Sequence, residues 1–210
     1  MQETTKKRSY AAPVVFVIMV TLGILCILFY SKQLLAEQNE KTDRGMRLSE
    51  QYFFTETYAK LVREGATLMK DATTEIGRLQ AKEKLGEARF ASMEAVSLLG
   101  EALRIRTGQT AEELKPAVDG LRKALTSEDG ALYAVGEHEG PLTDAEKAML
   151  TEVAALAAEA EAALDVYLAP SGVAGYRIMA EGGEWIDAAL EAKTSFDAIA
   201  EAMDKPNLNP

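Results

Sequence analysis

Residues 11–30 read AAPVVFVIMVTLGILCILFY, twenty consecutive residues without a charged side chain. A helix rises about 1.5 Å per residue, so this run spans about 30 Å, the thickness of the hydrocarbon core of a bilayer. Tyr10 and Tyr30 bracket the run where aromatic rings favour the membrane interface. Pro13 lies in the first turn, where a missing backbone N–H costs little. The run predicts a transmembrane helix at residues 10–30.

Two other interpretations compete with an uncleaved anchor. A buried core helix of a globular protein normally keeps a polar face, which this run lacks. A cleaved signal peptide has the same order of basic, apolar and polar segments, but it needs small residues at the cleavage site. The nearest such site, after Ala36, has Leu34 at a position that should be small. Cys26 is a poor lipidation site, because Leu25 precedes it and it lies inside the apolar run. The uncleaved anchor is therefore the favoured interpretation.

The N-terminal flank predicts how the anchor is oriented. Lys6, Lys7 and Arg8 precede the apolar run, and such basic residues remain on the cytoplasmic side. We therefore expect residues 1–9 to form a cytoplasmic tail, too short for a signalling module, and residues 31–210 to be extracytoplasmic. Cys26 is the sole cysteine, so no disulfide can form in the outer part, whose fold must depend on packing.

Length and charge narrow the classes of protein. The chain has 210 residues, of which 48% are hydrophobic and 27% charged, enough for one domain with a core. Its formal net charge is −10, and residues 1–9 carry +2, so the remainder carries −12. A polyanionic chain lacks the basic face that nucleic-acid phosphates require, so nucleic acid is excluded as a partner.

Beyond the apolar run the sequence is rich in Ala and Leu, a composition that favours helices. A juxtamembrane stalk is expected at residues 31–47. Apolar residues then follow one another at spacings of four and three, over about eight turns, which predicts an amphipathic helix: Leu48, Tyr52, Thr55, Ala59, Val62, Ala66, Met69, Thr73 and Ile76. No proline lies between Pro13 and Pro116, so the membrane helix is free to continue into this stripe. Gly45 and the polar stretch Glu37 to Arg47 are the favoured place for a bend.

Further helices follow to the C-terminus. A second apolar stripe ends before Thr107 and Gly108. A third helix at about residues 111–127 begins either with a capping box from Thr110 to Glu113 or with Pro116 in its first position. Residues 127–142 read as a loop with a short turn of helix.

A clearer capping box, Thr143 to Glu146, starts the next helix, which is expected to run as far as Pro170. The last helix covers about residues 185–203. We therefore predict an all-α protein, in which a single transmembrane helix precedes an antiparallel bundle of four or five helices at residues 48–204, with a flexible C-terminus at residues 205–210.

Chemistry for catalysis is missing from the sequence. One histidine excludes the paired motifs of helical metal sites, and there is no phosphate-binding loop, nucleophile elbow or cysteine outside the apolar run. Glu137, His138 and Glu139 lie in a glycine-bounded loop, where solvated charge is a better interpretation than a cation site. We expect no enzymatic activity, cofactor or bound metal.

A few residues are candidates for contact with a partner. Trp185, the only tryptophan, is either an anchor in the core or part of a partner-binding site. Tyr167, Tyr176 and Met179 lie near it in the sequence. The stretch 169–183, expected to be flexible, is the favoured contact region.

The order of these features resembles a known family. The basic-flanked anchor, the helix SEQYFFTETYAKLV (residues 49–62), the segment GPLTDAEKAML (residues 140–150) and the motif EWIDAALEA (residues 184–192) are similar to the N-terminal helical domain of YpeB-type spore germination proteins. Members of that family are membrane-anchored partners needed for a cortex-lytic enzyme to accumulate in spores. The resemblance implies a role in spore formation or germination, although the C-terminal mixed α/β domains of the family are not in this sequence.

Two functions fit this organisation. The first is a non-catalytic scaffold in the cell membrane, with its N-terminus in the cytoplasm, that holds another envelope or membrane protein at the outer surface. The alternative is a helical sensor that binds a small ligand in a pocket lined by polar groups and signals through a separate membrane partner. The lipid bilayer is a partner in both, and the long stripe also permits a homodimer paired as a coiled coil.

Overall fold

The computed structural model describes residues 11–126 and 131–203, and in them every regular element is a helix. The elements are α1 (Ala11–Asp71), α2 (Glu75–Thr107), α3 (Ala111–Thr126), α4 (Ala131–Ala134), α5 (Asp144–Leu164), α6 (Val173–Glu181) and α7 (Glu184–Met203). The all-α class is confirmed. The described residues hold seven helices rather than four or five, because short helices α4 and α6 form in segments expected to be mainly irregular.

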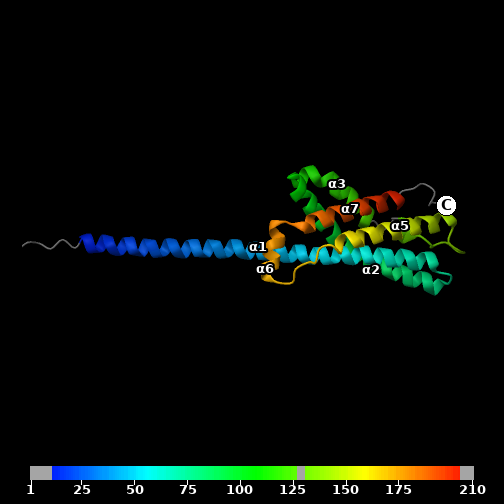
Figure 1. Ribbon diagram of the computed structural model, residues 1–210, viewed down its shortest axis with the longest axis horizontal. Coiled ribbons are helices and arrows are strands. Elements are labelled where there is room, and N and C mark those ends of the chain that lie inside the picture. Colours follow the sequence, from blue (N-terminus) through cyan, green and yellow to red (C-terminus); the bar gives the residue numbers. More distant parts are fainter. Residues whose placement is uncertain (1–10, 127–130, 204–210) are drawn as a thin grey trace, which may run out of the picture.

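Helix α1 is a single rod of 61 residues whose N-terminal part projects from the rest of the molecule (Figure 1). Every side chain at positions 14–37 is exposed. Among the described residues α1 is the one helix long and apolar enough to cross a membrane. The expectation of a bend at Gly45 was wrong, because the helix continues unbroken through this residue.

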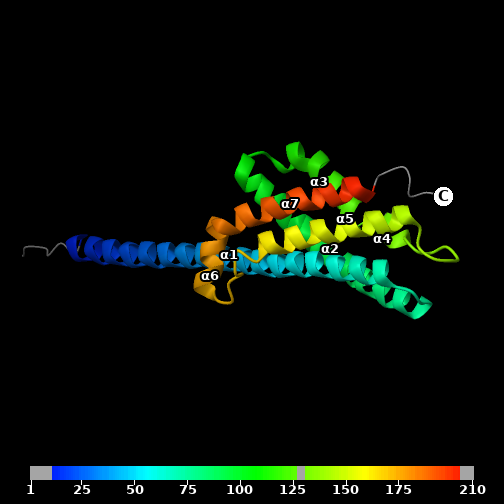
Figure 2. The same ribbon diagram turned by 45° about the vertical axis from the view of Figure 1, so that its right-hand side comes forward.

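The remaining helices pack around the C-terminal part of the rod. α1 contacts α2, α5 and α6, while α7 packs on α5, α2 and α3. Figure 2 shows α2, α5 and α7 lying along the rod, with α6 across it. We call residues 41–126 and 131–203 the helical body.

The core of the body follows the predicted stripes for most of their length. Leu48 to Met69 of the first stripe are all buried, as are Trp185, Ala189, Ala192, Phe196 and Ile199 of the last helix. Thr73 and Ile76 were expected to continue the first stripe, but both are exposed. The reason is local, because α1 ends at Asp71 and the Thr74 hydroxyl caps α2 by accepting a hydrogen bond from the Gly77 N–H at 3.1 Å.

Two predicted helix ends are confirmed by their caps, and the structure decides between the two starts considered for α3. Gly108, with φ of 67°, ends α2 in the left-handed conformation that glycine adopts without strain. Both halves of the capping box between Thr143 and Glu146 form at the start of α5. α3 begins at Ala111, with a hydrogen bond from the Thr110 N–H to Glu113, so Pro116 lies inside the helix and not at its first position.

Candidate functional site

Residues 165–183, between α5 and α7, pack against α1, and we call this segment the collar. α5 ends at Leu164, before the predicted stop at Pro170, and α6 then forms at Val173–Glu181. Gly182 and Gly183, with φ of 112° and 119°, turn the chain into α7. The stretch 169–183, expected to be flexible, thus contains a helix that packs on α1.

Gly45 is the point of closest approach between the rod and the collar. It is buried, and the backbone of Tyr176 in α6 lies directly against it. A Cβ atom at position 45 would be 2.8 Å from the Cα of Tyr176 and closer still to its carbonyl group. Because backbone atoms occupy this space, only glycine lets α6 lie so close to α1.

Three polar contacts flank Gly45 along the rod. Lys41 Nζ forms an ion pair with Glu181 Oε1 at 2.7 Å, and the Arg177 Nε–H donates to the Thr42 hydroxyl at 2.9 Å. One turn beyond Gly45, the Ser49 hydroxyl donates to a collar carbonyl, that of Pro170, at 2.7 Å. Hydrogen bonding to Lys41 lowers the pKa of the exposed Glu181 carboxyl. The collar is therefore held on both sides of the close contact.

An aromatic pair joins the N-terminal part of the collar to α1. The rings of Tyr52 in α1 and Tyr167 in the collar meet edge to face, with centroids 5.2 Å apart. The buried Tyr52 hydroxyl donates to the Leu164 carbonyl at 2.7 Å, which fixes the C-terminal end of α5 on the rod. Burial raises the pKa of Tyr52 well above its ordinary value, so the hydroxyl keeps its proton.

The four residues predicted to contact a partner are engaged within the chain. Trp185 and Met179 are fully buried, and the indole Nε1–H donates to the Met179 carbonyl at 3.0 Å. Tyr167 and Tyr176 are half-buried and lie against α1. Trp185 is thus placed as an anchor in the core. Contact of this region with another protein stays a prediction.

The collar also carries exposed apolar side chains that are not among the four residues predicted to contact a partner. Leu168 is 92% exposed, and Val166, Val173 and Ile178 are also exposed. The spacing of Leu168 matches the apolar face of the preceding helix, but this residue lies beyond the end of α5. Its position shortly before Pro170 was the available signal, since a helix seldom continues up to a proline.

At the opposite end of the body, a polar cluster fixes the loop before α5. The Glu146 carboxylate accepts hydrogen bonds from the N–H groups of Thr143 and Gly136, at 2.7 and 3.0 Å, and contacts His138 Nε2 at 2.8 Å. Burial raises the pKa of Glu146, but the hydrogen bonds outweigh burial and lower it to about 2. The hydrogen bond to Glu146 in turn raises the pKa of His138. Lys82 pairs with Glu137 at 2.6 Å, so this cluster acts as a structural cap.

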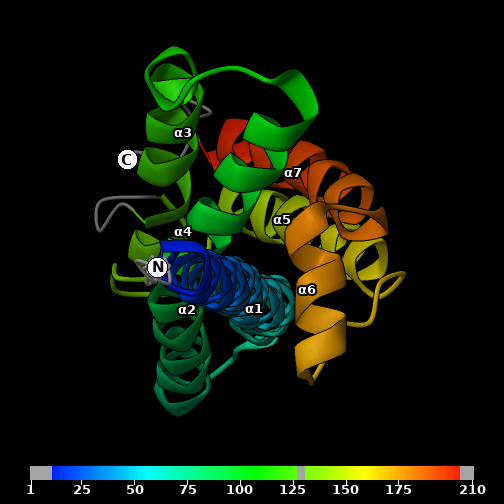
Figure 3. The same ribbon diagram turned by 90° about the vertical axis from the view of Figure 1, so that its left-hand side faces the viewer.

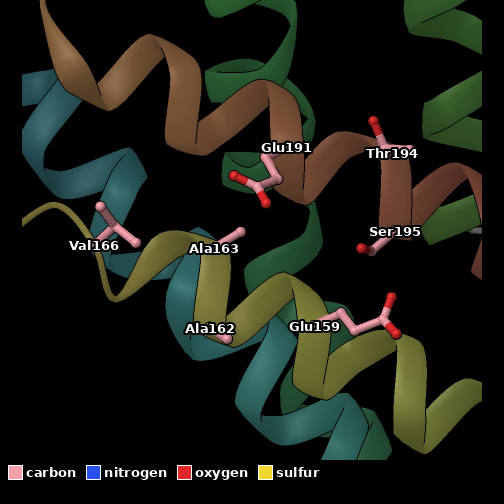
Figure 4. A pocket seen from close by; sticks show the side chains of 7 residues that line it. All are labelled: Glu159, Ala162, Ala163, Val166, Glu191, Thr194 and Ser195. Atoms are coloured by element: carbon pink, nitrogen blue, oxygen red, sulfur yellow. The ribbon is translucent and has the colours of Figure 1, made fainter.

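One groove and the spacing of the His, Cys, Asp and Glu side chains bear on whether the body can bind a small ligand or a metal ion. A solvent-open groove of about 520 Å³ lies between α5 and α7 (Figure 4) and is lined by Glu159, Ala162, Ala163, Val166, Glu191, Thr194 and Ser195. Among the described residues, no three His, Cys, Asp or Glu side chains gather where they could hold a metal ion. Every buried side-chain N or O atom in this part of the chain has a hydrogen-bond partner.

Comparisons with known proteins add no relative: no protein-family model, curated protein or solved structure matches the chain. The resemblance to YpeB-type proteins therefore stays a prediction. Lys6, Lys7 and Arg8, on which the predicted orientation depends, lie outside the described residues.

Proposed function

We propose that this chain is a single-pass membrane protein that holds a non-catalytic helical scaffold at the outer surface of the cell membrane. The observation that carries the proposal is the continuity of α1, which is one helix from its exposed apolar residues 14–30 to Met69 in the core of the body. The exposed, uncharged residues 14–30 would be unstable in water and are stable in lipid. Lys6, Lys7 and Arg8 support an N-terminus in the cytoplasm.

The body is best described as an antiparallel bundle of α1, α2, α5 and α7. Gly65 of α1 lies beside Leu85 of α2. Arg44 precedes Gly65 in α1 and forms an ion pair at 2.6 Å with Glu101, which follows Leu85 in α2. These pairings support opposite directions for the two helices. Arg63 of α1 pairs with Glu161 of α5 at 2.6 Å. Such a bundle gives a rigid base on which a partner protein can dock.

The surroundings of the groove between α5 and α7 support a scaffold over a ligand sensor. A sensor needs an enclosed pocket with polar groups that are free to form hydrogen bonds with a ligand. The groove is open to solvent, and the buried polar side-chain atoms of the described residues are already paired. We accordingly propose another envelope protein as the main partner, with a second copy of the chain as a further binding partner.

Two measurements test this function. A reporter that is active only outside the cytoplasm, fused after Met203, is expected to be active, whereas activity of a cytoplasm-only reporter at the same position would reverse the topology. Crosslinking in intact membranes, followed by purification in detergent, is expected to recover a partner in stoichiometric amount.

The matched control for crosslinking is Leu150→Asp. Leu150 is fully buried in α5, so a carboxylate there disrupts the body and leaves the apolar segment of α1 unchanged. A partner that binds the folded body is lost in this variant. A partner that is retained, or the absence of any partner with the unmodified chain, would contradict the scaffold function.

A further inference from the structure

Four large apolar side chains lie exposed on the outer face of α2. Ile76, Leu79, Phe90 and Met93 are 72%, 70%, 88% and 52% exposed. A single exposed apolar residue is ordinary on a protein surface, whereas a group on one face marks a contact site. Figure 3, which looks along the rod, shows the N-terminal part of α2 at the edge of the body. We call these four side chains the outer stripe.

The outer stripe has the spacing of a two-stranded coiled coil. Ile76 and Leu79 are three residues apart, and the same two positions recur fourteen residues later as Phe90 and Met93. Fourteen residues are two heptads, so the four side chains take the a and d positions of one register. A strict repeat of seven stays in line when two helices wind around each other. The stripe therefore matches a helix with the same repeat, and α2 of a second copy is such a helix.

The middle heptad limits the strength of this pairing. Glu83 and Gly86 take its a and d positions, and both are exposed. In a symmetric pair the two Glu83 carboxylates face each other, and a charged a position lowers the stability of a coiled coil. The outer stripe therefore suits copies that are already held close together, as two chains anchored in one bilayer are.

The charges beside the outer stripe favour one direction of pairing. Lys82 and Arg89 take the g positions on one side, and Glu87 and Glu94 take the e positions on the other. In a parallel pair each g position faces the next e position of the partner, which sets Lys82 opposite Glu87 and Arg89 opposite Glu94. An antiparallel pair would set like charges opposite each other. The flanking charges therefore favour two parallel α2 helices.

Some of these groups already have partners within the chain. Lys82 Nζ lies 2.6 Å from Glu137 Oε1, and Lys84 Nζ lies 2.8 Å from Glu87 Oε2. Glu137 and Glu87 are exposed, at 65% and 47% of their side chains, and ion pairs with exposed members contribute little to stability. The carboxylates and ammonium groups can therefore exchange partners across a contact at little cost.

The membrane imposes the same direction. The rods of two copies that share a bilayer cross it in the same direction, and in each copy α2 runs opposite to α1. The two α2 helices are therefore parallel to each other. Because α2 crosses the rod at an angle (Figure 1), the rods of such a pair enter the bilayer tilted, as transmembrane helices commonly are. The apolar stripe of α1, by contrast, is buried within the body.

We propose that the outer stripe of α2 is the contact between two copies of this chain in one membrane, related by a two-fold axis. The inference rests on the proposed function, because the shared anchor brings the copies together and makes them parallel. Each a and d side chain of the stripe then faces its own copy. In dilute detergent, where each micelle holds one copy, the stripe stays open to solvent.

The test measures disulfide formation between full chains in phosphatidylcholine vesicles, with Cys26→Ser as background. The reporter is Gly86→Cys, a d position that retains the whole stripe and has open space around its Cβ position. The matched control is Gly120→Cys, which has the same open space and is exposed on α3. Copper phenanthroline oxidises the thiols, non-reducing gels measure the dimer, and flotation of the vesicles shows whether the chain is in the bilayer.

We expect the reporter at position 86 to give a disulfide dimer in vesicles and the control at position 120 to give none. Adding Phe90→Ser to the reporter should lower the yield about tenfold, because two aromatic side chains leave the contact. Phe53→Ser, which makes the same change on the exposed face of α1, should leave the yield unchanged. Glu83→Leu, which removes the two facing carboxylates, should raise the yield.

Several outcomes would overturn the proposal. Equal yields at positions 86 and 120 mean random collision, and a yield that Phe90→Ser does not lower means that the outer stripe does not hold the copies together. A lower yield with Glu83→Leu would refute the a and d register. In each of these cases the vesicles still carry the chain and the anchor stands, whereas a chain that does not float with the vesicles refutes the proposed function itself.

Discussion

Replacing Gly45 by alanine tests the packing of the collar on the rod. In wild type the backbone of Tyr176 occupies the place of a side chain at position 45, and its Cα lies 2.8 Å from the point where the alanine Cβ would be. Ordinary contacts between such atoms begin near 3.4 Å. α6 must therefore move away from α1, and the hydrogen bonds of Arg177 and Ser49 must lengthen with it.

The size of the effect comes from two opposing contributions. Overpacking of a tight contact costs about 1–3 kcal/mol. Alanine in a helix interior is favoured over glycine by about 1 kcal/mol, which offsets part of that cost. We therefore expect Gly45→Ala to lower the free energy of unfolding by up to about 2 kcal/mol and to loosen α6 more than the rest of the body.

Gly86→Ala is the matched control. Gly86 lies in the interior of α2 with no neighbouring atom within 4 Å of its Cβ position, so only the helix preference remains. This variant is expected to be more stable than wild type by about 0.5–1 kcal/mol. Urea unfolding of the full chain in detergent, followed by far-ultraviolet circular dichroism, measures both variants. Hydrogen exchange of the α6 amides reports on the collar.

The reasoning would be refuted if the two alanine variants changed stability in the same direction. It would also be refuted if Gly45→Ala left the exchange rates of the α6 amides unchanged, because α6 would then not depend on the close approach to α1.

Four other predictions concern the Glu146–His138 pair, Trp185 and Phe90. Glu146→Gln should lower the free energy of unfolding by up to about 3 kcal/mol at neutral pH, because the folded state lowers the pKa of the Glu146 carboxyl from its ordinary 4.5 to about 2. In wild type this stabilisation is present above pH 4.5 and disappears as the pH falls through about 2. In the variant, the free energy of unfolding should therefore depend less on pH in this range. For His138 the pH dependence of stability has the opposite sign, because the folded state raises the pKa of the imidazole. The protonated ring stabilises the fold below its ordinary pKa of 6.5, and this stabilisation is lost as the pH rises through the folded-state pKa. A profile of stability against pH for His138→Gln should lack this loss. Trp185→Phe removes the buried donor to the Met179 carbonyl and should cost about 1–3 kcal/mol in urea unfolding, and wild-type stability would rule out the anchoring role. Phe90→Ser should change stability by less than about 0.5 kcal/mol, so a larger loss would mean that something covers this side chain.

Local rules predicted most of the helices. The capping box of Thr143 and Glu146 and the glycine at position 108 each act within one turn, so the residues alone indicate where α5 starts and α2 ends. Periodicity likewise identified the buried faces of α1 and α7. Periodicity extended the stripe past the end of α1 to Thr73 and Ile76, because the four-and-three spacing of the sequence continues after the helix has ended.

The candidate site was predicted less well. The stretch 169–183 was identified as a contact region, but Met179 within it and Trp185 just beyond it are buried, while Leu168 and Ile178 are exposed. Which side chains of a nine-residue helix face outwards depends on the element beneath it. Here that element is α1, which ends about 100 residues earlier in the chain.

The sequence by itself determined that this chain is helical and that its residues 11–30 are suited to a bilayer, because propensity, capping and hydropathy act between near neighbours. Only the tertiary structure decided that α1 runs unbroken through Gly45 and that α6 lies across it. A glycine in a sequence reads as a bend, but at position 45 the helix stays intact and the missing side chain makes room for the backbone of Tyr176. That close approach joins residues far apart in the chain, and no local pattern encodes it.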